Sequence, residues 1–367
     1  MGVVVIGGGV VGTALGAELG DQDTSVTLLE RDELGGGTTA TSAAVFTWQQ
    51  TTPESYDHAL RERAWETYEP LVEAGEISFE QVGLLSVAES ARYAETLRDA
   101  GGLLRTYGLD AEWVDADGLR DHGLTADGVR GGLYTPEEGY FDPIELVRHF
   151  ADRARAAGVD VRTGTTVTDI DVEDGAVAGV GTGDGRLDAD VVVNAAGPWA
   201  SEINDMVGVA TPLRHTFGPI LVVEGASHDL PFTLFESKRY LRPEGAGRAY
   251  VGKYLTDYAD GEEFDPDDPP VVDASFRSEV DELVATSVPA LEDATVVDEW
   301  GGLRTVTPDG RPMVGESPVG GFYLAVGMNG VGVTLAPAVA DLLVTDLVDE
   351  RPMALDRLAP SRFEPGR

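Results

Sequence analysis

The sequence predicts an α/β fold in which a Rossmann-like dinucleotide-binding domain with a parallel sheet is interleaved with a β-rich α+β domain. Three observations predict it. A G-x-G-x-x-G pattern lies between a strand-like run and a helical run at the start of the chain. Strand-like and helical runs alternate through the 367 residues, a length sufficient for two domains. A second strand, glycine turn and helix occupy residues 321–343.

The first elements predict a β-α-β unit. The apolar run 2–6 is expected to be a strand, residues 10–20 an amphipathic helix, and "SVTLLE" a strand ending at Glu30. Gly7, Gly9 and Gly12 would allow a tight turn, close approach of a pyrophosphate and close helix packing. Glu30 would accept hydrogen bonds from a ribose. A glycine turn with a purely structural role is the alternative.

The remaining elements follow from periodicity. Helical spacing predicts five further helices, near 58–74, 90–107, 143–157, 273–286 and 331–348. Strands are expected as four short runs between 159 and 193 and as a block from about 213 to 255, with an acidic, proline-rich surface loop at 256–271. The predicted dinucleotide-binding domain is therefore discontinuous, with residues 1–76, 142–212 and 299–367. The predicted substrate-binding domain comprises 77–141 and 213–298.

Composition narrows the class of protein. The chain has 65 acidic against 26 basic residues, a net charge of −39, and only two lysines. This pattern is typical of proteins from salt-loving microbes, where concentrated salt screens self-repulsion, and it argues against nucleic-acid partners. No stretch reaches the roughly 20 apolar residues of a membrane helix, and the chain opens directly into a strand, so a cytoplasmic location is expected. Without cysteine, and with no metal spacing among the histidines, no metal site is predicted.

The order of motifs resembles the D-amino-acid oxidase superfamily of FAD enzymes, which includes glycine oxidase, sarcosine oxidase and D-amino-acid dehydrogenase. The resemblance runs from Val3 to about Leu347. It rests on the G-x-G-x-x-G pattern with Glu30, "GTTATSAA", "VVNAAGPWA", "GGLRTVTPDGRPMVG" and "GMNGVGVTLAPAVADLL". It implies an oxidoreductase that passes a hydride from a small amino acid to flavin N5, after which the imine product is hydrolysed.

The resemblance also implies the cofactor contacts. Glu30 would hold the ribose, with Arg31 beside the adenine, although a solvated surface arginine is the alternative for Arg31. The other expected contacts are the pyrophosphate loop Gly7, Gly9, Val10, Val11 and Gly12, the path to the isoalloxazine at Thr38, Thr39 and Ser42, the adenine contact Val167, the turn Ala196 and Gly197, and the helix start Gly330, Val331, Gly332, Val333 and Thr334. That helix start would face the flavin pyrimidine edge, where reduced flavin is negative. The "GTTATSAA" loop has no histidine and the chain no cysteine, so non-covalent FAD is expected.

On the substrate side the resemblance places Arg304 against the substrate carboxylate, a planar group that suits a bidentate guanidinium. An internal ion pair is the alternative. Tyr240 matches a substrate-facing tyrosine of relatives, with strand packing as its alternative. His215 and Arg242 are further candidates, with solvent exposure an equal prospect for Arg242.

The electron acceptor is oxygen, a quinone or a carrier protein, and the sequence slightly favours a dehydrogenase. Sarcosine oxidases carry an oxygen-activating lysine where this chain has Tyr250, and Lys253 would face the other side of the strand. Two rival functions remain: a dehydrogenase of hydroxy acids or glycerol-3-phosphate, and a flavin-binding subunit of a larger complex. The sequence predicts no particular number of subunits.

Overall fold

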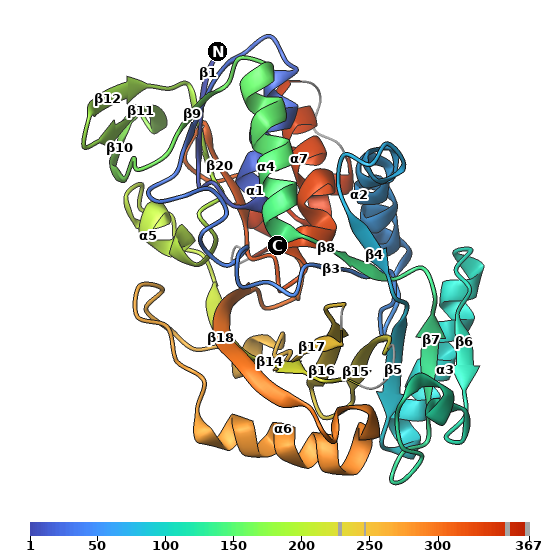
Figure 1. Cartoon of the computed structure of the whole chain (residues 1–367). Helices are drawn as coiled ribbons and strands as arrows, with labels where there is room; N and C mark the ends of the chain where they lie inside the picture. The colour runs from blue at the N-terminus through green and yellow to red at the C-terminus, as the bar shows by residue number, and fades with distance from the viewer. Residues whose placement is uncertain (227–229, 246, 349–352, 364–367) are drawn as a thin grey trace.

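The computed structural model describes residues 1–226, 230–245, 247–348 and 353–363, so His228 lies outside it. A six-stranded sheet forms the upper half of the molecule (Figure 1). Its strand order is β19 (Met313–Glu316), β20 (Phe322–Val326), β13 (Val191–Asn194), β1 (Gly2–Ile6), β2 (Ser25–Leu29) and β9 (Asp160–Arg162). All neighbours pair in parallel except β19 with β20. This is the predicted Rossmann-like sheet.

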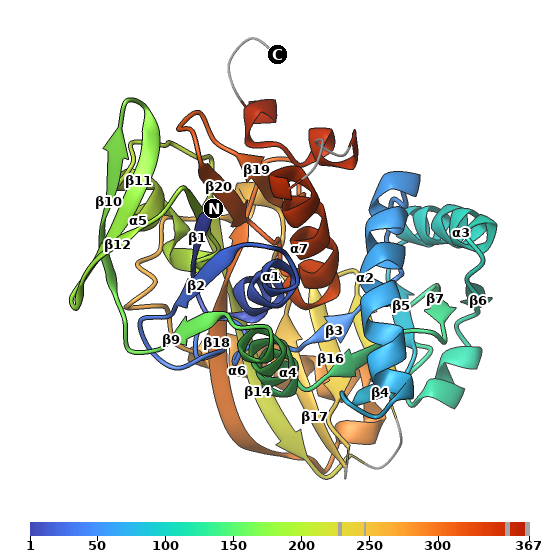
Figure 2. The same ribbon diagram turned by 90° about the horizontal axis from the view of Figure 1, so that it is seen from above.

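Helices cover one face of this sheet and a small antiparallel sheet covers the other (Figure 2). The helical layer contains α1 (Val10–Gly20), α4 (Pro143–Ala156) and α7 (Gly332–Val348), with α2 (Ser55–Glu73) against α7. The opposite layer contains β10 (Val167–Glu173), β11 (Ala176–Thr182), β12 (Gly185–Asp188) and the short helix α5 (Ala200–Asp205). Along β1, Val3 and Val5 pack toward the helices while Val4 and Ile6 pack toward the other layer, as strand alternation requires.

The prediction that residues 10–20 form an amphipathic helix is wrong in one respect. Nine of the eleven residues of α1 are buried, so the helix has almost no polar face. The reason is its position, because α4 and α7 flank it while β1 and β2 lie beneath it. The region 159–193 likewise contains β12 in addition to the four expected strands.

An eight-stranded sheet forms the lower half. Its order is β18 (Thr295–Val306), β14 (Arg214–Glu224), β17 (Arg248–Lys253), β16 (Arg239–Pro243), β15 (Phe232–Phe235), β5 (Leu84–Ala88), β7 (Gly131–Thr135) and β6 (Glu112–Val114). Helix α6 (Ala274–Ser287) lies across its outer face, and α3 (Ala91–Thr106) packs on β5 and β7 (Figure 1). A small sheet of β3 (Val45–Phe46), β8 (Gly139–Phe141) and β4 (Phe79–Gln81) lies between the halves. Strand β18 runs across the predicted domain boundary at 299.

The eight-stranded sheet has two different faces. Leu221, Val223 and Val251 pack against Phe276 and Leu283 of α6, which makes the outer face a hydrophobic core. The alternate residues of the same strands, among them Ile220 and Tyr240, point the other way, toward the Rossmann-like half. The inner face of this sheet is therefore available to line a site.

Candidate active site

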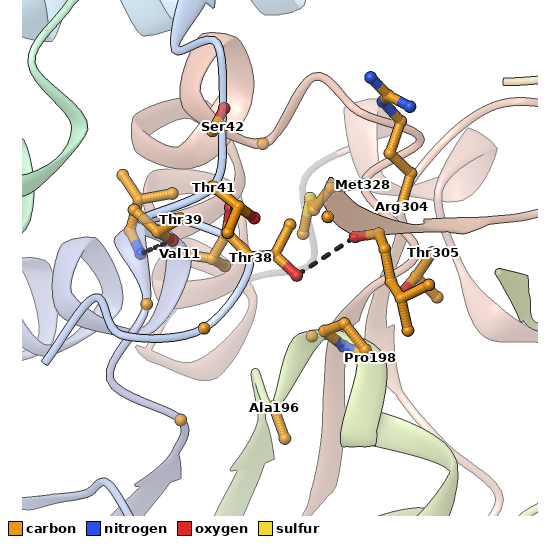
Figure 3. Close-up of a pocket in the computed structure, with 18 of the residues that line it drawn as sticks. Val11, Thr38, Thr39, Thr41, Ser42, Ala196, Pro198, Arg304, Thr305 and Met328 are labelled. Carbon is orange, nitrogen blue, oxygen red and sulfur yellow. Dashed lines mark hydrogen bonds between the residues drawn. The ribbon is translucent and has the colours of Figure 1, made fainter. Parts of the chain in front are cut away.

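A cavity of about 860 Å³ lies between the two halves of the molecule. Most of the residues predicted for the cofactor and substrate line it; of that set, Gly12, Tyr250, His215 and Arg242 do not. In Figure 3, Thr38, Thr39 and Thr41 lie on one side of the cavity, and Arg304 and Thr305 extend from the strand on the other. The cavity thus joins residues from both halves.

The first glycine turn forms one end of the cavity. Gly7 has a φ of +110°, and a Cβ on Gly12 would overlap the carbonyl oxygen of Gly7. Gly12 therefore acts from behind the turn, by letting α1 pack closely on β1. The α1 N-terminus faces the cavity, and the Thr39 hydroxyl accepts a hydrogen bond from the backbone N–H of Val10 at 3.2 Å.

Glu30 is fixed beside this turn. Its carboxylate accepts hydrogen bonds from the backbone N–H of Gly8 at 2.6 Å and of Asp32 at 2.9 Å. Both bonds orient the carboxylate at the carboxyl end of β2, where a nucleotide ribose binds in Rossmann-like sheets.

Arg31 belongs to a contact that spans the two halves. Its guanidinium carbon lies 4.2 Å from the centroid of the Trp199 ring, and its Nη2 is 2.6 Å from Oδ1 of Asp267. The Trp199 indole N–H donates to the same Asp267 oxygen at 2.9 Å. The hydrogen bond from Arg31, followed by that from Trp199, lowers the pKa of Asp267. The acidic loop therefore reaches the end of the cavity that contains Glu30, and Arg31 lines this end while it is paired.

The loop 38–42 is attached to strand β18. The Thr38 hydroxyl donates to the carbonyl of Leu303 at 3.2 Å (Figure 3), and the Trp300 indole N–H donates to the carbonyl of Thr41 at 3.3 Å. These bonds hold the loop between the first glycine turn and Arg304.

The second glycine turn follows β20. Asn329 and Gly330 both have positive φ, at +50° and +81°, before α7 begins at Gly332. The Asn329 side chain accepts a hydrogen bond from the backbone N–H of Thr307 at 2.9 Å and donates to the carbonyl of Gly327, which fixes the turn. A second helix N-terminus thus faces the same cavity.

Glycines on the inner face of the eight-stranded sheet make room for two large side chains. Tyr240 pairs with Gly252, and a Cβ on Gly252 would lie 2.6 Å from the Tyr240 ring. A Cβ on Gly218 would overlap the guanidinium of Arg304. Because these positions are glycine, Tyr240 and Arg304 lie flat on the sheet.

Arg304 and Tyr240 each place a buried polar atom in the site without a hydrogen-bond partner among the described residues. Arg304 donates from Nη2 to the carbonyl of Lys253 at 3.0 Å, whereas its Nη1 and the Tyr240 hydroxyl are buried without a hydrogen-bond partner among the described residues. Burial lowers the pKa of Arg304 and raises that of Tyr240. No acidic group in the described part of the chain pairs with Arg304, so the internal ion pair is not found. A buried, unpaired cation is costly unless an anion completes it.

Three other candidates lie outside this cavity. His215 is buried behind Thr305, whose hydroxyl is 3.2 Å from His215 Nδ1, and burial lowers the His215 pKa. Arg242 is 4% exposed, ion-paired with Glu244, and held between the rings of Tyr140 and Tyr250 at 4.1 Å from each. Tyr250 and Arg242 line a separate, neighbouring cavity. Arg242 is thus buried and paired, unlike the solvated alternative.

Sequence reasoning missed several lining residues. They are the side chains Ile220, Phe232, Leu234, Tyr254, Thr256 and Met328 toward Arg304, and Trp199 and Asp267 toward Glu30. The sequence did contain a signal for Tyr254. It follows Gly252 by two residues, and residues two apart on a strand point to the same face of the sheet. No sequence pattern connects Asp267 with Trp199.

The site suits a long dinucleotide. Two glycine turns and two helix N-termini face one cavity that runs from Glu30 to Arg304. Within the described ranges no group of three or more His, Asp or Glu side chains is arranged to hold a metal ion. The same ranges contain no helix long and apolar enough to span a membrane.

The amino-acid sequence matches a known protein family. The model described as "FAD dependent oxidoreductase" matches residues 2–346. Glycine oxidase of Geobacillus kaustophilus is 29% identical, over 98% of this chain and 95% of its own length. The 4-methylaminobutanoate oxidase (formaldehyde-forming) of Paenarthrobacter nicotinovorans is 28% identical over 95% of this chain, which spans only 44% of that relative.

Solved structures agree in fold. L-proline dehydrogenase from P. horikoshii superposes with a TM-score of 0.89 at 24% identity, covering 100% of this chain and 98% of its own. Glycine oxidase from Geobacillus kaustophilus gives 0.84 at 26% identity, covering 99% and 98%.

Proposed function

We propose that this chain, which belongs to the FAD dependent oxidoreductase family, binds FAD without a covalent link and oxidises the C–N bond of a small amino acid. Relatives named for glycine and for 4-methylaminobutanoate support an amino-acid substrate. The observation that carries the proposal is Arg304, a half-buried cation whose buried Nη1 has no hydrogen-bond partner among the described residues, beside the Tyr240 hydroxyl, which is buried and likewise unpartnered there.

The chain's own residues would divide the work. Arg304 would pair with the substrate carboxylate, and the Tyr240 hydroxyl would donate to it. Glu30 and the α1 N-terminus would hold the ribose and pyrophosphate, and the α7 N-terminus would face the flavin ring. Bound FAD would supply the hydride acceptor, so the substrate would lose a Cα hydride to it, and the substrate nitrogen would release a proton to water. The resulting imine reacts with water to give an oxo acid and an amine.

Anaerobic reduction of the yellow holoenzyme tests this proposal. Small amino acids should bleach the flavin absorbance near 450 nm, whereas the corresponding 2-hydroxy acids and glycerol-3-phosphate should not. Bleaching by hydroxy acids alone would contradict C–N oxidation. A protein that takes up FAD but is reduced by neither class, and that purifies with a stoichiometric partner, would be a subunit of a larger complex.

We also propose that the reduced enzyme passes its electrons to an acceptor other than oxygen. Both lysines are ion-paired away from the cavity: Lys238 lies 3.1 Å from Asp257, and Lys253 lies 2.6 Å from Glu279 of α6. Reoxidation of the reduced holoenzyme should be much faster with a quinone or ferricyanide than with air-saturated buffer. Equal rates would favour an oxidase.

We further propose that the protein works in concentrated salt in the cytoplasm. The excess of 65 acidic over 26 basic residues, spread along the whole chain, supports this interpretation.

A further inference from the structure

The part of the cavity beside Arg304 has an apolar wall. Leu234 pairs with Tyr240, Tyr240 with Gly252, and Gly252 with Ile220, so the side chains of one row share the inner face of the sheet. Phe232 lies on the same face of β15 as Leu234, and Met328 lines the cavity from the second glycine turn. The glycine in the row provides the space in front of this wall.

Charge is distributed very unevenly along the cavity. Besides Arg304, the charged lining residues that the structure describes are Glu30, Arg31, Asp32, Glu33, Glu202 and Asp267. These residues lie at the end of the cavity that we assign to the nucleotide. Glu30 accepts a hydrogen bond from the first glycine turn, and Arg31 pairs with Asp32 and Asp267. Burial, followed by the charge of Asp267, raises the pKa of Glu202, and Arg31 opposes this. Among the described residues that line the substrate side of the cavity, Arg304 is therefore the only charged one.

Two nearby cations outside the cavity, Arg242 and Lys253, are already paired. Arg242, the adjacent cation on the sheet, is neutralised by Glu244 and enclosed by two tyrosine rings. Lys253 faces α6 and pairs with Glu279. The Tyr254 hydroxyl donates to the carbonyl of Phe235 at 2.8 Å, so it is not free for a second anion.

We infer that this site selects amino acids with one carboxylate and an uncharged, predominantly apolar remainder, and that it rejects dicarboxylates and cationic side chains. This inference rests on the proposed function for its amino group, but its charge selectivity follows from the wall itself. One carboxylate satisfies Arg304. A second carboxylate or an ammonium would be buried against Ile220, Phe232 and Leu234 without a partner, which is strongly unfavourable. An aliphatic side chain instead gains by burial there.

The first arm of the test uses turnover. We would measure the reductive kcat/KM of the holoenzyme anaerobically with both enantiomers of alanine, valine and proline, and with glycine and sarcosine. The comparison set is aspartate, glutamate, iminodiacetate and lysine. The best uncharged substrate should exceed every charged one on the order of 100-fold. A charged substrate within tenfold of the best would overturn the inference.

The second arm needs no turnover, so it separates the two proposals. Propionate and isobutyrate should perturb the oxidised flavin spectrum at concentrations on the order of 100-fold below malonate and succinate. If monocarboxylates bind selectively while no amino acid reduces the flavin, the amino-acid function fails and the charge selectivity stands. If dicarboxylates bind as tightly, the selectivity fails.

A matched pair of variants locates the selectivity. Leu234 faces the cavity opposite Tyr240 in register. Leu234→Arg adds a cation and should shift the preference toward dicarboxylates by at least tenfold. Leu234→Gln adds length and polarity without charge and should not shift it. An equal response of both variants would contradict the role assigned to charge at this wall.

Discussion

Replacing Arg304 by leucine separates a substrate anchor from a structural arginine. Arg304 is half-buried, its Nη2 donates to the carbonyl of Lys253, and its Nη1 is buried with no partner among the described residues. Leucine removes one hydrogen bond from a charged group, worth about 1.5–3 kcal/mol, but it also removes a charge held out of water without an anionic partner, which offsets that loss. The melting temperature of Arg304→Leu should therefore stay close to that of the wild type.

Catalysis should respond in the opposite way. Truncating one partner of a buried, hydrogen-bonded charge pair costs about 2–5 kcal/mol, and each 1.4 kcal/mol is about tenfold. The second-order rate constant for anaerobic reduction of the flavin by amino acids should therefore fall about 30- to 3,000-fold, while the FAD content stays unchanged. Arg304→Lys should recover only part of this, because an ammonium lacks the two-pronged geometry. Amino-acid esters should distinguish the enzymes poorly, since they have no carboxylate to lose.

Arg311 provides the control. Its guanidinium makes a two-pronged pair with Asp57, at 2.9 and 2.8 Å, and a further pair with Glu54 at 3.0 Å. Arg311→Leu should lower the melting temperature with little change in kcat/KM, the reverse of Arg304→Leu. If Arg304→Leu lowers the melting temperature as much as Arg311→Leu does, or loses FAD, then Arg304 is a structural residue and the reasoning is refuted.

Three further predictions concern the cofactor, salt and pH. Acid or heat should release FAD from the chain, because it has no cysteine and "GTTATSAA" no histidine; flavin fluorescence retained on the denatured chain would disprove this. The melting temperature and activity should rise from low salt to molar KCl, where the Debye length falls to about 3 Å, and a flat profile would remove the halophilic interpretation. Burial raises the pKa of Glu138 to about 7 from 4.5, so between these values the folded chain holds a proton that the unfolded chain releases, and stability falls as pH rises. In urea unfolding, wild type should lose up to about 3 kcal/mol more than Glu138→Gln from pH 5 to 8, and parallel profiles would exclude this role of Glu138.

The Rossmann-like half was predictable because its signals are local. The glycine spacing, the apolar run of β1 and Glu30 lie within 30 residues, and the matching strand and helix termini, β1 (Gly2–Ile6) and α1 (Val10–Gly20), follow from them. The error in α1 has a non-local cause: α7, more than 300 residues away in the chain, buries the face that the sequence left polar or small. The family resemblance is confirmed by the match over residues 2–346.

The substrate side was harder because its residues come together through sheet register. Tyr240 and Tyr250 both lie on the inner face, yet Tyr240 lies over Gly252 in the main cavity while Tyr250 packs against Trp300 and Arg242 beside the second one. The alternation of side chains along a strand predicts the same face for both tyrosines. They differ only in the residues paired beside them, which are Gly252 for Tyr240 and Arg242 for Tyr250. The contact between Asp267 and Arg31 likewise depends on the path of a loop, for which the sequence offers no period.

The glycines explain why one strand position becomes a site while its neighbour becomes packing. In the row of Leu234, Tyr240, Gly252 and Ile220, the missing side chain leaves room for a tyrosine ring and for the space in front of it. In the next row, Arg242, Tyr250 and Val222, every position carries a bulky side chain, and the arginine is enclosed by aromatic rings and paired. Arg304 meets the same condition as Tyr240, because Gly218 lies beneath its guanidinium. Among the described cations of this sheet, Arg304 thus combines an unpartnered Nη1 with a glycine that keeps space open beside it, and this combination is why we propose Arg304 as the place of the substrate carboxylate.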